Sequence, residues 1–280
     1  MPRTQVIGRL EAALGGFFGS GPRMLVMPGR SLPREAARRH ARRREAVPGE
    51  QWACRTERFV VYSDGSAAGA ETAAALSDTC EADLTHIRAW FGGIAPADLP
   101  AEVHVDPDAV GAFHLSCRDT DIHVAADPMR APGYVAALLV EVLAATAQAG
   151  WDCSRANGEA LSRALAFTLH PELAAGFTGS GQSWWQAGHP DRVNDKSATD
   201  ADELACGCGV LFLLYLRHQV GVDWTQIIAA GSSDLGETYR SLTGFGGSVG
   251  FADFVERLDN LEEDGRLLLP RDGNPFPVER

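Results

Sequence analysis

The residue best placed to do chemistry in this 280-residue chain is Glu141, the only charged side chain in the segment from Tyr134 to Ala149 (YVAALLVEVLAATAQA). Apolar residues recur there at three- and four-residue spacing, which predicts a helix. The helix has almost no polar face, so it is expected to be buried. Burying an unpaired charge costs several kcal/mol, so Glu141 should be neutral, paired or directed into a cavity. The alternative is a glutamate at the helix surface or tied to an arginine.

A second glutamate, Glu159, lies in the next predicted helix, which runs from Asn157 to about His170. With Asn157 as the N-cap, Glu159 would lie in the first helical turn, where the helix dipole favours a carboxylate by roughly 0.3–1 kcal/mol. Its role is therefore either chemical or structural. Arg155 or Arg163 could pair with either glutamate and turn the two acids into a buried ionic staple.

Aromatic and basic side chains provide the predicted substrate contacts. Tyr134 lies on the helix face of Glu141, and Arg155 precedes the second helix. Trp184 and Trp185 lie in the stretch from Leu173 to Ala201, which contains four glycines and a proline and is predicted to be a loop. These two indoles would line a cleft and stack on a substrate, or else pack over the edge of the domain.

The sequence predicts no metal site and no cofactor. His104, His114 and His123, Cys117 and the Cys206-Gly-Cys208 pair have none of the established metal-ligand spacings. His104 and His123 alternate with apolar residues in predicted strands, where backbone groups would satisfy them. Cys153 has no neighbouring base in the sequence, which favours an inert buried thiol over a nucleophile. Six cysteines in a chain of this length are too few to indicate a disulfide framework.

Charge is unevenly distributed along the chain. Residues 1–45 hold ten arginines against three glutamates, and because the whole chain carries −12, residues 46–280 carry −19. The acidic body would repel phosphate, so we expect the arginine-rich arm to lie beside that body rather than on nucleic acid. No apolar run approaches the roughly 20 residues of a membrane span, and no secretory leader is evident. A cytoplasmic location is expected; nothing indicates an oligomeric state.

Strands and helices do not alternate regularly in the predicted order of elements. Short helices are expected at Val6–Phe18 and Pro33–Ala46, with a brief strand at Met24–Met27. A strand at Phe59–Tyr62, a long helix at Ala68–Phe91, strands at Glu102–Asp106 and Asp121–Ala125, and the two glutamate-bearing helices follow. The last third is predicted to be helical, with helices near Asp202–Val220, Asp223–Ala230, Gly236–Thr243 and Gly250–Leu261. Strands followed by a run of helices favour an α+β fold.

This order of elements resembles the gluzincin-type zinc metallopeptidases, in which a small sheet lies over a helix bearing HExxH and a second helix supplies a glutamate ligand. The positions that match are Val140-Glu141-Val142-Leu143-Ala144 and Asn157-Gly158-Glu159-Ala160-Leu161. The resemblance covers residues 55–262. It implies a zincin-like α+β fold with a small mixed sheet packed on the active-site helix pair. The implied division is an arm at 1–50, an α+β subdomain at 51–172, a helical subdomain at 173–262 and a tail at 263–280.

The departure from the family pattern decides the predicted function. The two metal-binding histidines of HExxH correspond here to Val140 and Ala144, which have no lone pair to donate, so the usual zinc site should be empty. The resemblance leaves Glu141 as the family's general base and Glu159 as its third ligand. We expect a non-peptidolytic protein that binds a peptide, a small molecule or a partner protein in the former cleft. The alternatives are an acid/base enzyme using Glu141 with Glu159 on a small substrate, and a metallohydrolase with unconventional ligands.

Overall fold

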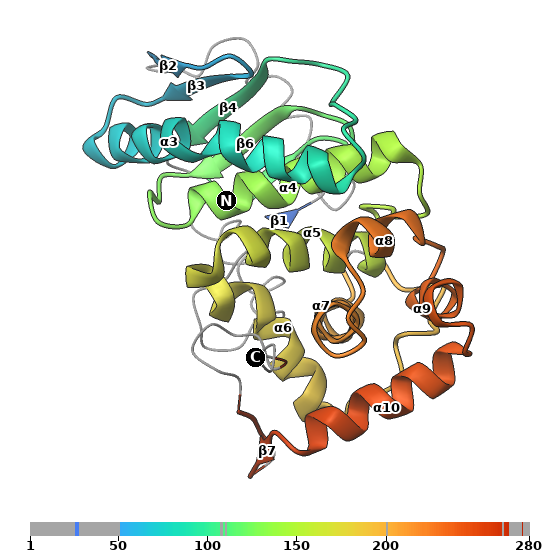
Figure 1. The fold of residues 1–280 in the computed structure, drawn as a ribbon. Coiled ribbons are helices and arrows are strands. Elements are labelled where there is room, and N and C mark those ends of the chain that lie inside the picture. Colours follow the sequence, from blue (N-terminus) through green and yellow to red (C-terminus); the bar gives the residue numbers. More distant parts are fainter. Residues whose placement is uncertain are drawn as a thin grey trace, which may run out of the picture.

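A computed structural model describes residues 26–27, 51–106, 109, 111–199, 201–264, 266–268 and 276, with 26–27 and 174–178 described by their backbone alone. The arginine-rich arm and the helices predicted at Val6–Phe18 and Pro33–Ala46 lie outside these residues. The described part is an α+β structure. Helices pack on a mixed sheet, and further helices lie below them in the view of Figure 1.

The described strands of the main sheet run in the order β1-β5-β6-β4-β3-β2. They are β1 (Val26–Met27), β2 (Gln51–Arg55), β3 (Phe59–Ser63), β4 (Ala101–Asp106), β5 (Ala112–His114) and β6 (Asp121–Ala125). Strands β3, β4 and β6 are parallel, whereas β5 runs antiparallel to β6 and β2 antiparallel to β3. Three of the predicted strands, β3, β4 and β6, are thereby confirmed.

One face of this sheet carries a ladder of stacked rings. The register places Tyr62 beside His104, His104 beside His123, and Phe113 beside His123. Their ring centroids lie 5.0, 4.9 and 4.8 Å apart. His104 Nε2 lies 3.1 Å from Asp121 Oδ1, so a carboxylate lies beside this imidazole.

The other face is covered by two long helices, α3 (Ala67–Trp90) and α4 (Ala131–Ala147) (Figure 1). Helix α3 begins where the Ser66 hydroxyl accepts a hydrogen bond from the Gly69 N–H, and it ends before two glycines at positive φ, Gly92 and Gly93. Its apolar face is buried as the spacing predicts. Helix α4 is buried at every position from Ala131 to Ala144, as expected for a helix without a polar face.

The remaining described helices pack below α4 (Figure 1). They are α5 (Ala156–Leu169), α6 (Ala174–Gln186), α7 (Glu203–His218), α8 (Trp224–Ala229), α9 (Leu235–Thr243) and α10 (Gly247–Asp259). A short 3₁₀ turn, Pro171–Leu173, joins α5 to α6, and a small hairpin of β7 (Glu262–Glu263) and β8 (Arg266–Leu267) follows α10. One continuous core joins residues of the sheet to residues of α7 and α10, so it crosses the boundary expected at 172/173.

Helix α6 corrects the sequence interpretation, which placed a loop at Leu173–Ala201. Gly181 allows close helix packing instead of breaking the helix. A side chain at Gly181 would collide with Leu211 of α7, and one at Gly207 of α7 would overlap the Ser180 carbonyl of α6. Tertiary packing therefore overrides the low helix propensity of glycine at these positions.

None of the helices in the described part of the chain combines the length and the apolar character needed to cross a bilayer.

Candidate functional site

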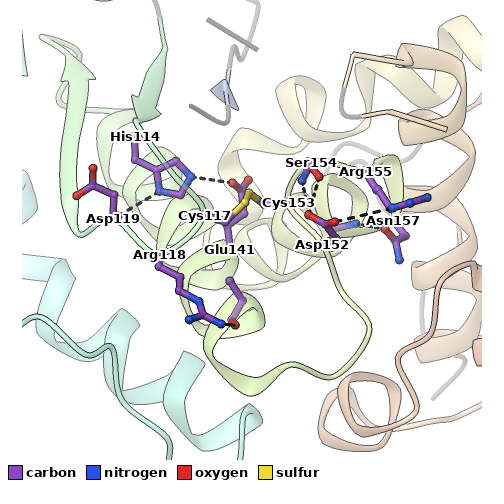
Figure 2. The surroundings of a disulfide bond; sticks show 12 residues. His114, Cys117, Arg118, Asp119, Glu141, Asp152, Cys153, Ser154, Arg155 and Asn157 are labelled. Atoms are coloured by element: carbon purple, nitrogen blue, oxygen red, sulfur yellow. Dashed lines mark hydrogen bonds and ion pairs between the residues drawn. A yellow bond between two sulfur atoms is a disulfide. The ribbon is translucent and has the colours of Figure 1, made fainter. Parts of the chain in front are cut away.

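The carboxylate of Glu141 lies inside the protein and faces a histidine. Its side chain is fully shielded from solvent, and its Oε2 lies 3.1 Å from Nε2 of His114, which is equally buried. His114 closes strand β5, so the pair links the sheet to α4, and Figure 2 shows the imidazole pointing at the carboxylate. The second oxygen, Oε1, has no hydrogen-bond partner among the described residues.

The hydrogen bonds of His114 fix how many protons this pair holds. Nδ1 lies 3.2 Å from the backbone carbonyl oxygen of Asp119, and because a carbonyl only accepts, Nδ1 must carry a hydrogen. Nε2 and Glu141 Oε2 then need one proton between them to form a hydrogen bond. The pair is either an imidazolium with a carboxylate or a neutral imidazole with a carboxylic acid. In both forms its net charge is zero, which is what burial requires.

A disulfide lies against this pair. Cys117, in the loop after β5, is bonded to Cys153, in the loop between α4 and α5, with the two Cα atoms 5.8 Å apart (Figure 2). The inert thiol predicted for Cys153 is therefore wrong. Ligand atoms of Cys153, His114 and Glu141 all lie within 4.8 Å of one another. The sequence conceals this grouping because the disulfide joins positions 36 residues apart.

Glu159 is held by a different partner. It lies in the first turn of α5, and Nη2 of Arg163, one turn further along, is 3.1 Å from its Oε2. Arg163 also donates a hydrogen bond to the Cys206 sulfur on α7. Burial by itself would lower the pKa of Arg163, but the acidic groups of Cys206, Glu159 and Glu141 outweigh it and raise that pKa. Burial raises the pKa of Cys206 to about 11, so its thiol is protonated at neutral pH.

Both glutamates therefore interact with the buried guanidinium of Arg163. Arg163 contacts Glu159 directly and interacts electrostatically with Glu141. This is the ionic staple that the sequence offered as one alternative, with Arg163 rather than Arg155 as its cation.

Arg155 lies at the start of α5 and lines a small surface pocket. Helix α5 begins at Ala156, and Asn157 does not cap it; its amide donates to the carbonyls of Gly150 and Ser232. The pocket has about 10 Å³ of room, enough for one water molecule. Its polar walls come from three segments of the chain: Arg155, Asn157, Arg192, Asp195, Ser233 and Asp234.

The three aromatic residues predicted to contact substrate lie in the core. Trp184 is fully buried, stacks on Phe254 of α10 at 5.5 Å between centroids, and donates its indole N–H to the Pro190 carbonyl. Trp185 is 6% exposed and stacks on His189. Tyr134 is 4% exposed, and its burial raises the pKa of its phenol. The described contacts bring none of the three to the Arg155 pocket.

Sequence reasoning found both acids and named Arg163 among the cations, but it missed the grouping of His114, Cys117 and Cys153 with Glu141. The one local signal was the three-residue separation of His114 and Cys117. The pairing of β5 with β6 and the packing of α4 against α5 bring these residues together, and a local sequence pattern reveals neither contact.

The fold and the site define an α+β protein with an enclosed acid–base cluster. Comparisons of this chain with protein-family models, with curated proteins and with solved structures find no match.

Proposed function

We propose that this chain has the architecture of a gluzincin metallopeptidase without its zinc site, and that it is a non-peptidolytic protein that binds a peptide, a small molecule or a partner protein. The observation that carries the proposal is the setting of Glu141. At the family's general-base position, the carboxylate is closed inside α4 and bonded to His114, and Val140 and Ala144 beside it are core residues.

The order and placement of the elements support this reading. An antiparallel strand, β5, lies between β6 and the short β1, and α4 packs against both β5 and β6. Helix α5, which bears Glu159, packs directly against α4. These relations are like those that the resemblance implies between an antiparallel strand, an active-site helix and a glutamate helix. They differ in one respect, because β1 pairs beyond β5 and β5 is therefore not the edge of the described sheet.

The enclosure of the acids argues against peptide hydrolysis. A water molecule attacking a peptide bond needs an activating metal or an accessible base, and the side chains of Glu141 and Glu159 are 0% and 1% exposed. The same enclosure disfavours the acid/base enzyme, because a small substrate has no described opening to either carboxylate. Binding without turnover is the function that this geometry supports best.

Arg155 is the residue we assign to ligand contact. Its side chain is 44% exposed, and it lines the polar pocket at the start of α5 together with Arg192. Arg192 is already paired with Asp195 in the same lining, so the half-exposed Arg155 is the guanidinium that we expect to contact a carboxylate-bearing ligand such as an acidic peptide.

The first test asks whether the purified chain cleaves peptides. A quenched-fluorescent peptide library, incubated with and without added Zn²⁺, should show no cleavage above buffer, and Glu141→Gln should behave as the wild type does. Cleavage that needs zinc and is lost in Glu141→Gln would overturn the proposal. In parallel, fluorescent acidic peptides should bind the wild type, and Arg155→Gln should weaken binding more than Arg118→Gln, an exposed arginine that donates to the Ala145 carbonyl.

The second test restores the missing ligands. Val140→His with Ala144→His should create zinc uptake of about one ion per chain, because two imidazoles four residues apart share a helix face with the Glu159 helix nearby. Leu139→His with Leu143→His is the matched control, since it has the same spacing on a neighbouring face. Uptake equal in both double variants, or absent from both when circular dichroism shows them folded, would count against the assigned architecture.

A further inference from the structure

A group of zinc-type ligands surrounds the Cys117–Cys153 disulfide. Imidazole nitrogen, carboxylate oxygen and cysteine sulfur from His114, Glu141 and Cys153 lie within 4.8 Å of one another, and Cys117 is bonded to the last of them. We propose that reduction of this disulfide converts the cluster into a zinc site with four protein ligands, His114, Cys117, Glu141 and Cys153.

The geometry already suits two of the four ligands. Neighbouring ligands of a tetrahedral zinc with bonds of about 2.0–2.3 Å lie roughly 3.3–3.8 Å apart. Nε2 of His114 and Oε2 of Glu141 are 3.1 Å apart, so an ion between them needs only a small opening of the pair. Breaking the sulfur–sulfur bond frees both cysteines to move to thiolate spacing.

The surroundings of His114 are those of a metal-binding imidazole. Its Nδ1–H is donated to the Asp119 carbonyl, which fixes the ring orientation and leaves Nε2 aimed at the cluster. Glu141 provides a second, independent indication of a cation site. Its residue is 1% exposed, and its Oε1 has no hydrogen-bond partner within the described structure. A buried carboxylate oxygen without a donor is costly, and a cation at this place would satisfy it.

The charges around the cluster also fit a bound ion. Zn²⁺ with two thiolates, one carboxylate and a neutral imidazole has a net charge of −1. The guanidinium of Arg163 interacts with Glu141 and would offset that charge. A mixed sulfur and nitrogen donor set favours zinc over magnesium or calcium, which prefer oxygen alone.

The conversion needs a two-electron reductant, and a dithiol is one that can supply both electrons. Its thiolate attacks the sulfur of Cys117, which is the more accessible of the two, and Cys153 leaves as a thiolate. The second thiol of the reductant then displaces Cys117 and closes a disulfide on the reductant, so two electrons have passed to the protein. Zinc binding releases three protons: two from the thiols and the one shared by His114 and Glu141. Oxidation by a disulfide reverses these steps and expels the ion.

A site of this kind is closed to water. All four positions of the tetrahedron are taken by protein groups, which is typical of structural zinc and not of hydrolytic zinc. The ion would tie β5, α4 and the two cysteine loops together in the reduced protein as the disulfide ties the loops in the oxidised one. The site uses Glu141 but neither position 140 nor position 144, and it stands whether or not the proposed binding function does.

The test measures zinc uptake in both redox states of the intact chain. Protein reduced with a phosphine and protein oxidised to the disulfide are each titrated with Zn²⁺ against a chromophoric chelator, and bound metal is counted by elemental analysis. The reduced protein should hold about one ion per chain and the oxidised protein less than about a tenth of that. Co²⁺ in place of Zn²⁺ should give the charge-transfer absorption of thiolate ligands in the reduced protein alone.

Variants separate this site from incidental binding. His114→Gln and Cys153→Ser should each lower zinc affinity at least about 100-fold, because even outer-shell changes cost 10–100-fold. His170→Gln is the matched control, since His170 is also buried and bonded to a carboxylate, that of Asp83, and Cys54→Ser controls for loss of a free thiol. Both controls should bind as the wild type does.

Glu141→Gln guards against misfolding, because it keeps a neutral hydrogen-bonding group beside His114. Folded Glu141→Gln protein should lose most of its zinc affinity. Equal uptake in the two redox states, no uptake by the reduced protein, or wild-type affinity in folded His114→Gln or Glu141→Gln would each overturn the proposal.

Discussion

Removing the buried guanidinium is the sharpest perturbation of this core. Arg163 is 6% exposed, contacts Glu159 and Cys206, and interacts with Glu141. Arg163→Met keeps much of the side-chain volume but leaves Glu159 buried at 1% exposure without its cation. Breaking a buried ion pair in this way costs about 3–5 kcal/mol. That is a large share of the roughly 5–15 kcal/mol by which a domain is stable.

The assay is urea denaturation followed by tryptophan fluorescence, together with thermal scans. At about 2–4 °C per kcal/mol for a domain of this size, Arg163→Met should lower the melting temperature by roughly 6–20 °C. Arg118→Met is the matched control, because Arg118 is an exposed arginine that donates to the Ala145 carbonyl, and it should change stability by less than about 1 kcal/mol.

A double-mutant cycle with Glu159→Gln identifies the source of the loss. Because Glu159→Gln removes the charge that Arg163 neutralises, the double variant should be more stable than the sum of the single losses predicts, by about 1–3 kcal/mol. Two results would refute the reasoning: a loss below about 1 kcal/mol in Arg163→Met, or strictly additive single effects.

Two further predictions concern other buried groups. Burial alone would lower the pKa of His170, but hydrogen bonds and charge from Asp83 and Glu172 outweigh burial and raise that pKa above 6.5. The stabilising contribution of His170 is therefore present below about pH 6.5 and is lost as the pH rises through the raised pKa. The stability gap between wild type and His170→Gln, measured by denaturation, should therefore shrink from about pH 6 to about pH 8.5, and a gap that widens would contradict this. Trp184→Ala should cost about 3–5 kcal/mol because the indole is wholly buried on Phe254; unchanged stability with loss of ligand binding would show a substrate contact instead.

Local periodicity was sufficient to predict the elements that carry the two acids. Helix α4 and the burial of Glu141 follow from a segment with almost no polar residues, and the apolar spacing of α3 predicts the face it buries. Strand β6 matches its predicted limits, Asp121 and Ala125. These predictions need only the 2- and 3.6-residue periods that backbone geometry imposes.

What could not be predicted depends on contacts between distant parts of the chain. His114 looked like a loop residue because β5 is only three residues long and exists through its pairing with β6. Helix α6 looked like a loop because of its glycines, and the need for Gly181 is explained only by α7, the helix packed against it. The Cys117–Cys153 bond brings together two loops that neither composition nor spacing connects. In each case the prediction needed a contact with a distant segment of the chain, which local structural propensity does not contain.

The carboxylates of Glu141 and Glu159 are buried in the core, and each is paired with a different basic side chain. Glu141 shares a proton with His114, which comes from the sheet, and Glu159 is paired with Arg163, which comes from its own helix. Each pair is close to neutral, so the core tolerates both acids only while both bases are present. A zinc ion at the histidine-motif positions would have to compete with these pairs. An ion at the reduced cysteine cluster would replace the two thiol protons and the proton between His114 and Glu141, and it would leave the pair of Glu159 and Arg163 in place. The second exchange disturbs far less of the core, which is why a metal is expected beside Cys153 and not between Val140 and Ala144.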